Sequence, residues 1–162
     1  MRKLGVFNFI SLNGYYKGLN EDISWHQHSG AEETEFSSRN ANAGGILLFG
    51  RVTYEMMERF WPTEQAMKSF PTVAEGMNKA EKIVFSRIMK KADWNNTRVM
   101  TGDIIEEIRK IKQTPGKDMT ILGSGTIVSQ FSEAGLIDGY QFILDPVVLA
   151  SGTSIFTGIQ KS

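Results

Sequence analysis

The chain alternates between short apolar runs and amphipathic segments, and glycines or prolines separate many of them. Apolar runs without helical spacing are typical of buried strands, whereas apolar positions that recur every three or four residues indicate helices. On this basis we expect strands over residues 2–12, 46–49, 82–86, 98–100, 119–122 and 139–149, the last of them broken at Asp145–Pro146. We expect helices over residues 31–43, 53–61, 104–112 and 126–134, and the start of a further element at 154–156. Residues 62–80 contain two prolines and only weak helical stretches.

Strands that alternate with single helices predict an α/β fold with a mainly parallel central sheet, because parallel neighbours need crossover connections. Asp103 is placed to cap the helix that begins at Ile104, and Met56, Met57 and Phe60 are expected in the core. No internal repeat or linker divides the chain, so residues 1–162 are expected to form a single domain.

Composition narrows the classes of function. The 162 residues include 18 Lys plus Arg and 18 Asp plus Glu, and this balance disfavours a nucleic-acid partner. The absence of cysteine excludes thiol catalysis and fits a reducing compartment. No apolar stretch approaches the roughly 20 residues of a membrane span, and Asn8 interrupts the start of the chain too early for a signal peptide. We therefore expect a cytoplasmic protein that acts on a small molecule and has neither a nucleic-acid nor a membrane partner.

Two junctions of the same kind stand out, Leu48–Thr53 and Ile121–Thr126. Each consists of the end of an apolar strand, a turn with glycine, and a helix beginning near threonine. Such a junction directs backbone N–H groups and the positive end of the helix dipole at one point, and glycine allows a phosphate to approach the backbone. A tight turn without a ligand explains the same glycines, and neither junction matches GxGxxG or a P-loop. Both interpretations stay open at this point.

An ordered series of five short motifs resembles the dihydrofolate reductase-like superfamily. The motifs are Ser11–Gly14, Phe49–Glu55, Ile83–Arg87, Leu122–Thr126, and Gly135–Asp138 with Asp145–Leu149 and Gly152. Within the superfamily the chain is most similar to the C-terminal reductase domain of the bifunctional riboflavin biosynthesis enzyme, and the resemblance spans nearly the whole sequence. It implies a three-layer αβα sandwich with a mainly parallel mixed sheet. It also implies an NADPH-dependent reductase of the 5-amino-6-(5-phosphoribosylamino)uracil type, which transfers hydride to a C=N or C=O of a small heteroaromatic or sugar-linked substrate.

The resemblance also implies site residues. Gly50, Arg51, Val52 and Thr53 would bind the pyrophosphate and 2′-phosphate of NADPH. Phe85, Ser86 and Arg87 would contact its adenosine end. The diphosphate and nicotinamide would be contacted by Gly123, Ser124, Gly125, Thr126 and Ile127. Phe9, Ser11, Leu12 and Asn13 would line the substrate pocket, with Trp25 as a lid. Glu32, Glu35 or a bound water would donate the proton. Two arginines near one phosphate favour NADPH over NADH.

The sequence departs from the family pattern at two kinds of position. Leu122 stands where the riboflavin enzyme's reductase domain carries Glu, and none of the glutamates at 32, 33 and 35 aligns with the buried carboxylate of dihydrofolate reductases. A dihydrofolate or pterin reductase and a non-catalytic NADPH-binding module therefore remain alternatives. The family usually finishes with a β-hairpin beyond Phe156, which we expect to be absent or incomplete in this sequence. A long apolar last strand would then expose an edge, which predicts a homodimer.

The segment Trp25–His28, with Glu32 and Glu33, offers two imidazoles and two carboxylates, a donor set that suits zinc or iron. Two histidines separated by one residue point the same way only on a strand, however, and this stretch has the composition of a loop. We therefore expect no metal. Gly123–Ser124–Gly125 lacks the G-x-S-x-G pattern of a hydrolase nucleophile elbow.

Overall fold

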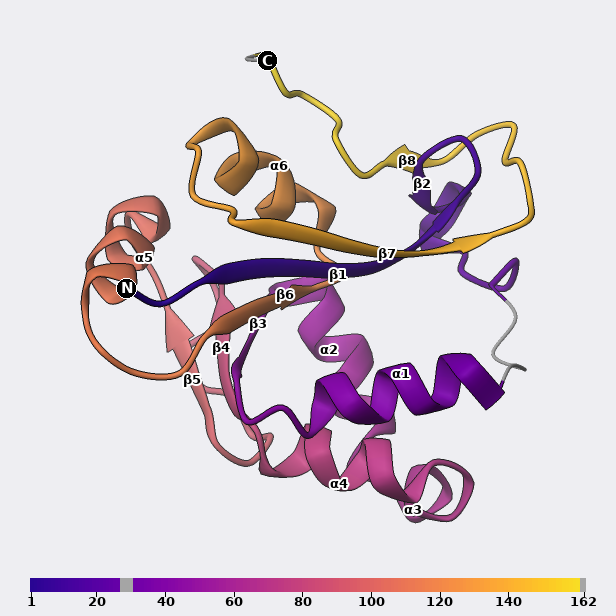
Figure 1. The fold of residues 1–162 in the computed structure, drawn as a ribbon, viewed down its shortest axis with the longest axis horizontal. Helices are drawn as coiled ribbons and strands as arrows, with labels where there is room; N and C mark the ends of the chain where they lie inside the picture. The colour runs from indigo at the N-terminus through magenta and orange to yellow at the C-terminus, as the bar shows by residue number, and fades with distance from the viewer. Residues whose placement is uncertain (27–30, 161–162) are drawn as a thin grey trace.

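The computed structural model describes residues 1–26 and 31–160, with the side chains of 31–33 left out (Figure 1). The strands are β1 (Leu4–Ser11), β2 (Tyr15–Lys17), β3 (Ile46–Gly50), β4 (Glu81–Phe85), β5 (Thr97–Met100), β6 (Met119–Leu122), β7 (Gly139–Asp145) and β8 (Thr153–Ser154). The helices are the 3-10 turn η1 (Leu19–Glu21) and α1 (Ala31–Ala41), α2 (Arg51–Phe60), α3 (Glu64–Ser69), α4 (Pro71–Lys79), α5 (Ile104–Gln113) and α6 (Gly125–Glu133).

The predicted strands and helices are confirmed, with shifts at their ends, but β2 and η1 fall in a stretch where no element was predicted. The last long strand ends at Asp145, at the predicted break, because Pro146 has no N–H for a sheet ladder. Residues 62–80 fold into two short helices despite their weak pattern. Thr63 caps α3 by accepting a hydrogen bond from the Ala66 amide at 3.2 Å, and Pro71 occupies the start of α4, where its fixed φ fits the first turn.

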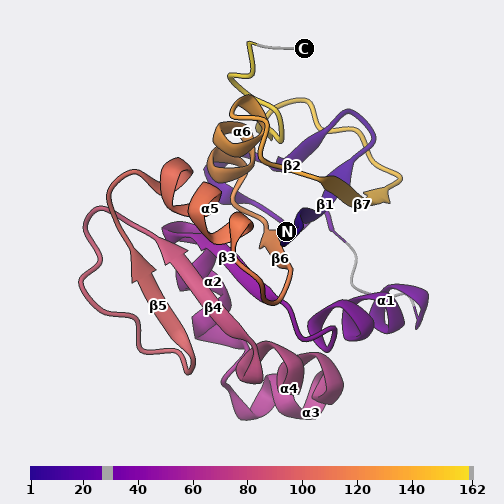
Figure 2. The same ribbon diagram turned by 60° about the vertical axis from the view of Figure 1, so that its left-hand side comes forward.

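The central sheet has six strands in the order β5-β4-β3-β6-β1-β7, and all its neighbouring pairs are parallel. Figure 2 shows this order running from β5 on the left to β7 on the right. The antiparallel part is a separate two-stranded ribbon, in which Tyr15 of β2 faces Ser154 of β8. Because the strands of the large sheet are parallel, their carboxyl ends lie at one edge, where ligands of open α/β sheets bind.

Two apolar layers separate the sheet from its helices, so the expected three-layer sandwich is confirmed. In β3, Ile46 and Leu48 pack toward α5 and α6, whereas Leu47 and Phe49 face the opposite side with α2 and α4. This near-continuous apolar run fits a strand that is covered on both faces. Figure 1 shows α5 and α6 on one side of the sheet and α1 to α4 on the other.

Helix α1 packs closely against α4. A Cβ added to Gly76 in α4 would lie 2.9 Å from the backbone of Ala41 at the end of α1, so only glycine permits this approach. Phe36 of α1 also contacts Phe7 of β1, with ring centroids 5.5 Å apart. These two contacts hold α1 beside the sheet as one wall of a cleft. In the described part of the chain, no helix is both long and apolar enough for a membrane crossing.

Candidate functional site

The two glycine junctions meet at the carboxyl edge of the sheet. The Gly50 amide, at the β3–α2 junction, donates to Ser124 Oγ at the β6–α6 junction at 2.7 Å. In return, the Ser124 amide donates to Thr53 Oγ1 at 3.1 Å. Parallel strands β3 and β6 are direct neighbours, so segments more than 70 residues apart in sequence become one site.

The two glycines of the second junction lie in closely packed positions. Gly123 has φ +57°, and a Cβ there would lie 2.9 Å from Thr53 Cγ2. Ser124 also adopts the left-handed conformation, with φ 56°. Gly125 is helical, and a Cβ there would overlap the ring of Tyr16 in β2. Tyr16 therefore covers Gly125 at the start of α6.

The N-termini of α2 and α6 have no side-chain caps. The residue before α2 is Gly50, which has no side chain, and the Ser124 hydroxyl bonds to the Leu122 carbonyl and the Gly50 amide instead of capping α6. The first backbone N–H groups of a helix lack intrahelical acceptors and carry the positive end of its dipole. Both helix ends therefore offer donors to an anion at this edge.

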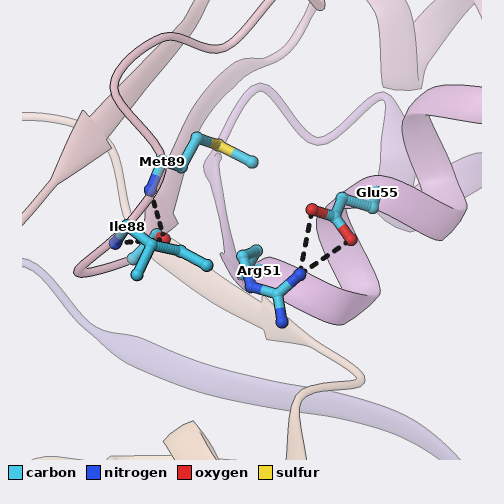
Figure 3. A network of polar contacts seen from close by, with 5 residues as sticks. Arg51, Glu55, Ile88 and Met89 are labelled. Carbon is cyan, nitrogen blue, oxygen red and sulfur yellow. Dashed lines mark hydrogen bonds and ion pairs between the residues drawn. The ribbon is translucent and has the colours of Figure 1, made fainter.

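Arg51, the first residue of α2, lies beside this edge. Its Nη1 donates to both carboxylate oxygens of Glu55 at 3.0 Å, and Figure 3 shows this pair next to the loop that carries Ile88 and Met89. That loop is held by Ser86, whose Oγ accepts from the amides of Ile88 and Met89 at 3.2 and 3.0 Å. The second arginine predicted for this site, Arg87, is exposed in the same loop.

Phe85 and Ile127 lie beside Gly50, but their side chains point into the core: Phe85 is the β4 partner of Gly50, and a Cβ at Gly50 would lie 3.4 Å from Ile127 Cγ1. Both are buried in the core between the sheet and α5 and α6, and Phe85 makes an edge-on contact with Phe131 at 5.5 Å. Thr126 is exposed and, with Gly125, lines a smaller cavity of about 400 Å³ between α6 and the segment around β8. The cofactor candidates are therefore divided between the junction, the core and a second surface.

A cleft of about 1040 Å³ opens between α1, α2 and the sheet. It is lined mainly by apolar and aromatic side chains, including Phe7, Phe9, Trp25, Phe60, Trp61 and Phe70. Val52, Thr53 and Gly123 of the two junctions reach the same cleft. The structure thus places two of the predicted substrate residues, Phe9 and Trp25, in the same cleft as the two glycine junctions. The size of the cleft suits a small organic ligand.

The expectation that Met56 and Phe60 belong to the core is wrong. Their side chains are 41% and 37% exposed and line the cleft, while Met57 lies between the cleft and the core. A helix that borders a cleft has the same apolar spacing as one that packs on a core, so periodicity does not separate the two.

The predicted substrate residues Ser11, Leu12 and Asn13 form a turn outside the lining of this cleft. Buried Ser11 donates from Oγ to Asn13 Oδ1 at 2.7 Å and accepts from the Tyr15 amide at 3.0 Å. Asn13 in turn bonds to both the carbonyl and the amide of Leu149. These contacts tie the end of β1 to the chain after β7.

Glu35, one of the two glutamates predicted as proton donors, does not line the cleft. Glu35 is 71% exposed and pairs loosely with Arg39 at 3.7 Å. The Glu32 side chain, together with Glu33 and His28 of the metal hypothesis, lies outside the described residues. Within the described residues, no three metal-ligating side chains come together.

The sequence did not predict a buried pair at the cleft. His26 Nδ1 lies 2.7 Å from Asp145 Oδ2, and both side chains are nearly excluded from solvent. His26 lines the cleft beside Phe9, with ring centroids 4.0 Å apart. The sequence signal for this contact was the position of Asp145, which ends an apolar strand directly before proline.

Lys17 and Glu21 form an ion pair that also lines the cleft, with Nζ and Oε1 2.6 Å apart. Partial burial opposes the charge on Lys17, but the hydrogen bond and the charge of Glu21 prevail and raise the pKa of the lysine. Lys17 therefore remains a cation at neutral pH.

The six-stranded parallel sheet, the paired glycine junctions and the aromatic cleft define an α/β sandwich with a ligand-sized cleft at the carboxyl edge of its sheet. The chain belongs to the RibD C-terminal domain family, whose model matches residues 2–162. It is 26% identical over 153 residues to the uncharacterized protein YyaP of Bacillus subtilis (strain 168), covering 94% of this chain and 79% of that protein.

Solved structures share the fold. A putative riboflavin biosynthesis protein from Shewanella sp. PV-4 superposes with a TM-score of 0.70 at 18% identity, covering 99% of this chain and 86% of the other. Dihydrofolate reductase from Enterococcus faecalis, complexed with NADP(H), gives 0.65 at 16% identity, covering 97% and 78%. The Thermotoga maritima diaminohydroxyphosphoribosylaminopyrimidine deaminase/5-amino-6-(5-phosphoribosylamino)uracil reductase gives 0.69 at 13% identity, covering 99% of this chain and 49% of that one.

Proposed function

We propose that the protein is an NADPH-dependent reductase of the riboflavin-biosynthesis type, which transfers hydride to a C=N or C=O of a small heteroaromatic or sugar-linked substrate. The observation that carries the proposal is the meeting of two uncapped helix ends, joined by the Gly50–Ser124 hydrogen bond, beside an aromatic cleft. Membership in the RibD C-terminal domain family supports the same class of reaction.

The residues present fit NADPH. The first amides of α2 and α6 would hold the phosphates, and Arg51 would face the 2′-phosphate. In the described part of the chain, Arg51 reaches Glu55 through Nη1 alone, so the other guanidinium nitrogens are available for a phosphate. When bound, the nicotinamide would supply the hydride, and the protein would position the two reactants and exclude water.

The cleft suits a flat ring that carries a polar group. Aromatic side chains such as Phe9 and Trp25 offer stacking surfaces, and Lys17 and Arg59 line the same cleft as cations. A phosphorylated sugar on a heteroaromatic ring, as in 5-amino-6-(5-phosphoribosylamino)uracil, would satisfy both features. A dihydrofolate or pterin reductase is the second candidate, because a pteridine ring matches the same aromatic lining. A nucleotide-binding module without catalysis is the third.

The deciding experiment adds NADPH to the protein and measures loss of the reduced nicotinamide absorbance with dihydrofolate, a pterin, or 5-amino-6-(5-phosphoribosylamino)uracil. Turnover with the pyrimidine supports the proposal, and turnover with only the first two supports the second candidate. NADPH binding without any turnover indicates the module. Met56→Trp should fill the cleft and raise the substrate KM, whereas Met67→Trp, at a similarly exposed methionine of α3 outside the cleft, should not.

We further propose that the protein is a cytoplasmic homodimer. In the described structure, β7 pairs with β1 on one side and forms an edge of the large sheet on the other. Leu144 on this strand is 57% exposed, and Tyr140 and Phe142 stack beside Phe156. An apolar edge strand is normally covered, and a second copy of the chain offers the matching edge.

A further inference from the structure

The two helix ends at the glycine junctions differ in how far they are covered. At the start of α2, Gly50 is half-buried and Val52 is 50% exposed, so this end is open to solvent. At the start of α6, Ser124 and Gly125 are both buried. The ring of Tyr16 covers this second end, since a Cβ built on Gly125 would lie 2.7 Å from Tyr16 Oη. An anion can reach the α2 amides directly, whereas the α6 amides lie behind an aromatic ring.

Tyr16 also lies between the two cavities of the protein. Tyr16 and the neighbouring Lys17 line the large cleft. Gly125, which lies against the Tyr16 ring, lines the smaller cavity of about 400 Å³ together with Thr126. Gly125 and Thr126 are both among the residues predicted to contact the cofactor. A single side chain therefore separates these two candidates from the cleft that Thr53 and Gly123 reach.

The backbone of β2 is irregular at Tyr16. Tyr15 lies opposite Ser154 and Lys17 lies opposite Thr153, so two steps along β2 correspond to one step along β8. Tyr16 is the extra residue between these two pairs. An extra residue in one strand has no partner across the ribbon, and such bulges redirect side chains near functional sites. The direction of the Tyr16 ring toward α6 is thus a property of the ribbon itself.

The contacts that hold the ring on α6 are local. Tyr16 is half-buried and packs against the apolar layer between the sheet and helices α5 and α6. Lys17 Nζ lies 5.4 Å from the centre of the Tyr16 ring, which is within the range of a cation–π contact. A half-buried side chain in a short ribbon can rotate while the six-stranded sheet stays intact. Rotation would open the start of α6 to the cleft.

We propose that Tyr16 is a gate on the cofactor site, because its ring covers the start of α6 and must rotate away before the diphosphate of NADPH reaches the α6 amides. This inference rests on the function proposed above. The ring and the diphosphate compete for the same place. The apparent dissociation constant of NADPH is therefore the intrinsic constant divided by the fraction of molecules in which the ring is rotated away.

The test measures NADPH binding to the full chain by stopped-flow nicotinamide fluorescence. Tyr16→Ala should lower the dissociation constant by about 10-fold, the gain expected if the ring is rotated away in roughly one molecule of ten. The gain should appear in the association rate, with the dissociation rate changed much less, because the ring competes with the cofactor only before binding. Tyr16→Phe keeps the ring and should bind NADPH as wild type does.

Tyr15→Ala is the matched control. Tyr15 is also a half-buried tyrosine of β2, and it is not among the described residues that line either cavity. This variant should loosen the ribbon without raising the association rate of NADPH. Tyr16→Leu is the second test variant in case Tyr16→Ala does not fold. Leucine keeps apolar packing but lacks the Cε1, Cζ and Oη atoms that approach Gly125, so it should also bind NADPH faster than wild type.

The outcomes separate the two proposals. If NADPH binds neither to wild type nor to any Tyr16 variant, the proposed function and the gate are both overturned. If NADPH binds to wild type and the association rate is the same in Tyr16→Ala and Tyr16→Leu, the gate alone is overturned. Faster dissociation from Tyr16→Ala would show that the ring contacts the bound cofactor, which also overturns the gate. An equal gain in Tyr15→Ala would assign the effect to the ribbon as a whole and contradict a specific role of Tyr16.

Discussion

The buried lysine of β4 makes stability depend on pH in a direction that can be measured. Lys82 is fully buried, and its Nζ donates to the carbonyls of Met77, Asn78 and Ala80 at 2.8, 3.3 and 2.6 Å. The Trp94 ring lies 4.5 Å from the same nitrogen. The lysine thus closes the carboxyl end of α4, a helix that forms part of the cleft wall. Burial nevertheless disfavours the ammonium and lowers the pKa of Lys82 from 10.5 to about 8.

The sign follows from proton binding. Between about pH 8 and pH 10.5 the unfolded chain keeps a proton on Lys82 that the folded protein has released, so the free energy of unfolding rises with pH across this interval. At roughly 1.36 kcal/mol for each pH unit, the interval corresponds to about 3 kcal/mol. This contribution is complete above pH 10.5 and is lost as the pH falls through about 8.

The assay is urea unfolding followed by circular dichroism at several pH values from 7 to 11, on wild type and Lys82→Met. Other lysines and tyrosines titrate in the same range, so the informative quantity is the difference in unfolding free energy between the two proteins. This difference should move in favour of wild type by up to about 3 kcal/mol as pH rises. Lys79→Met, at an exposed lysine of α4, is the control and should give a flat difference. A flat difference for Lys82→Met would show that burial does not perturb the lysine.

Three further predictions concern the site and the assembly. NADPH at about 100 times its dissociation constant should stabilise the protein by roughly 2.7 kcal/mol and raise its melting temperature more than NADH does. Arg51→Ala should reduce the difference between the two cofactors, and Glu55→Gln should increase the preference for NADPH a few-fold in affinity. Equal shifts in melting temperature with both cofactors would refute the 2′-phosphate assignment. Gly123→Ala should lower the free energy of urea unfolding by about 1–3 kcal/mol, because φ is +57° and the space for a Cβ is filled. Gly44→Ala should lower it less, because φ there is +77° but no atom lies within 4 Å. Equal losses would mean that packing adds nothing. Light scattering should give a dimer that Leu144→Lys dissociates, and an 18.1 kDa particle for wild type would contradict the edge-to-edge model.

The strands and helices that were predicted could be placed because many of the apolar runs are bounded by glycine, proline or a capping residue. Asp103 is a clear case, since its side chain accepts from the Glu106 amide at 3.1 Å at the start of α5. The face on which a residue of a doubly covered strand points could not be predicted. Phe85 was assigned to the cofactor, yet it packs on Phe131 in the core, because β4 is apolar on both faces and gives no alternation.

The part of the site made by distant contacts was beyond sequence reasoning. His26 and Asp145 are 119 residues apart, and one lies in an irregular segment with no periodicity. The histidine drew attention only as a metal candidate beside His28. The pairing of β1 with β7 places Asp145 beside Ser11 and so brings this carboxylate to the histidine. Strand pairing, rather than local pattern, creates this pair.

The glycines of the two junctions carry less of the functional argument than their sequence pattern indicates. Gly123 is required by its positive φ and by the Thr53 methyl group, so packing accounts for it, whereas a Cβ at Gly125 would meet the far end of the Tyr16 side chain, which would have to shift. A diphosphate that approaches Gly125 from the side of the absent Cβ must first displace Tyr16. The case for an anion therefore depends on the uncapped starts of α2 and α6 and on Arg51, all of which are independent of the glycines at 123 and 125. A phosphate site at this edge would consist of helix ends and a guanidinium, with the glycines serving to bring β3, β6 and β2 together beneath it.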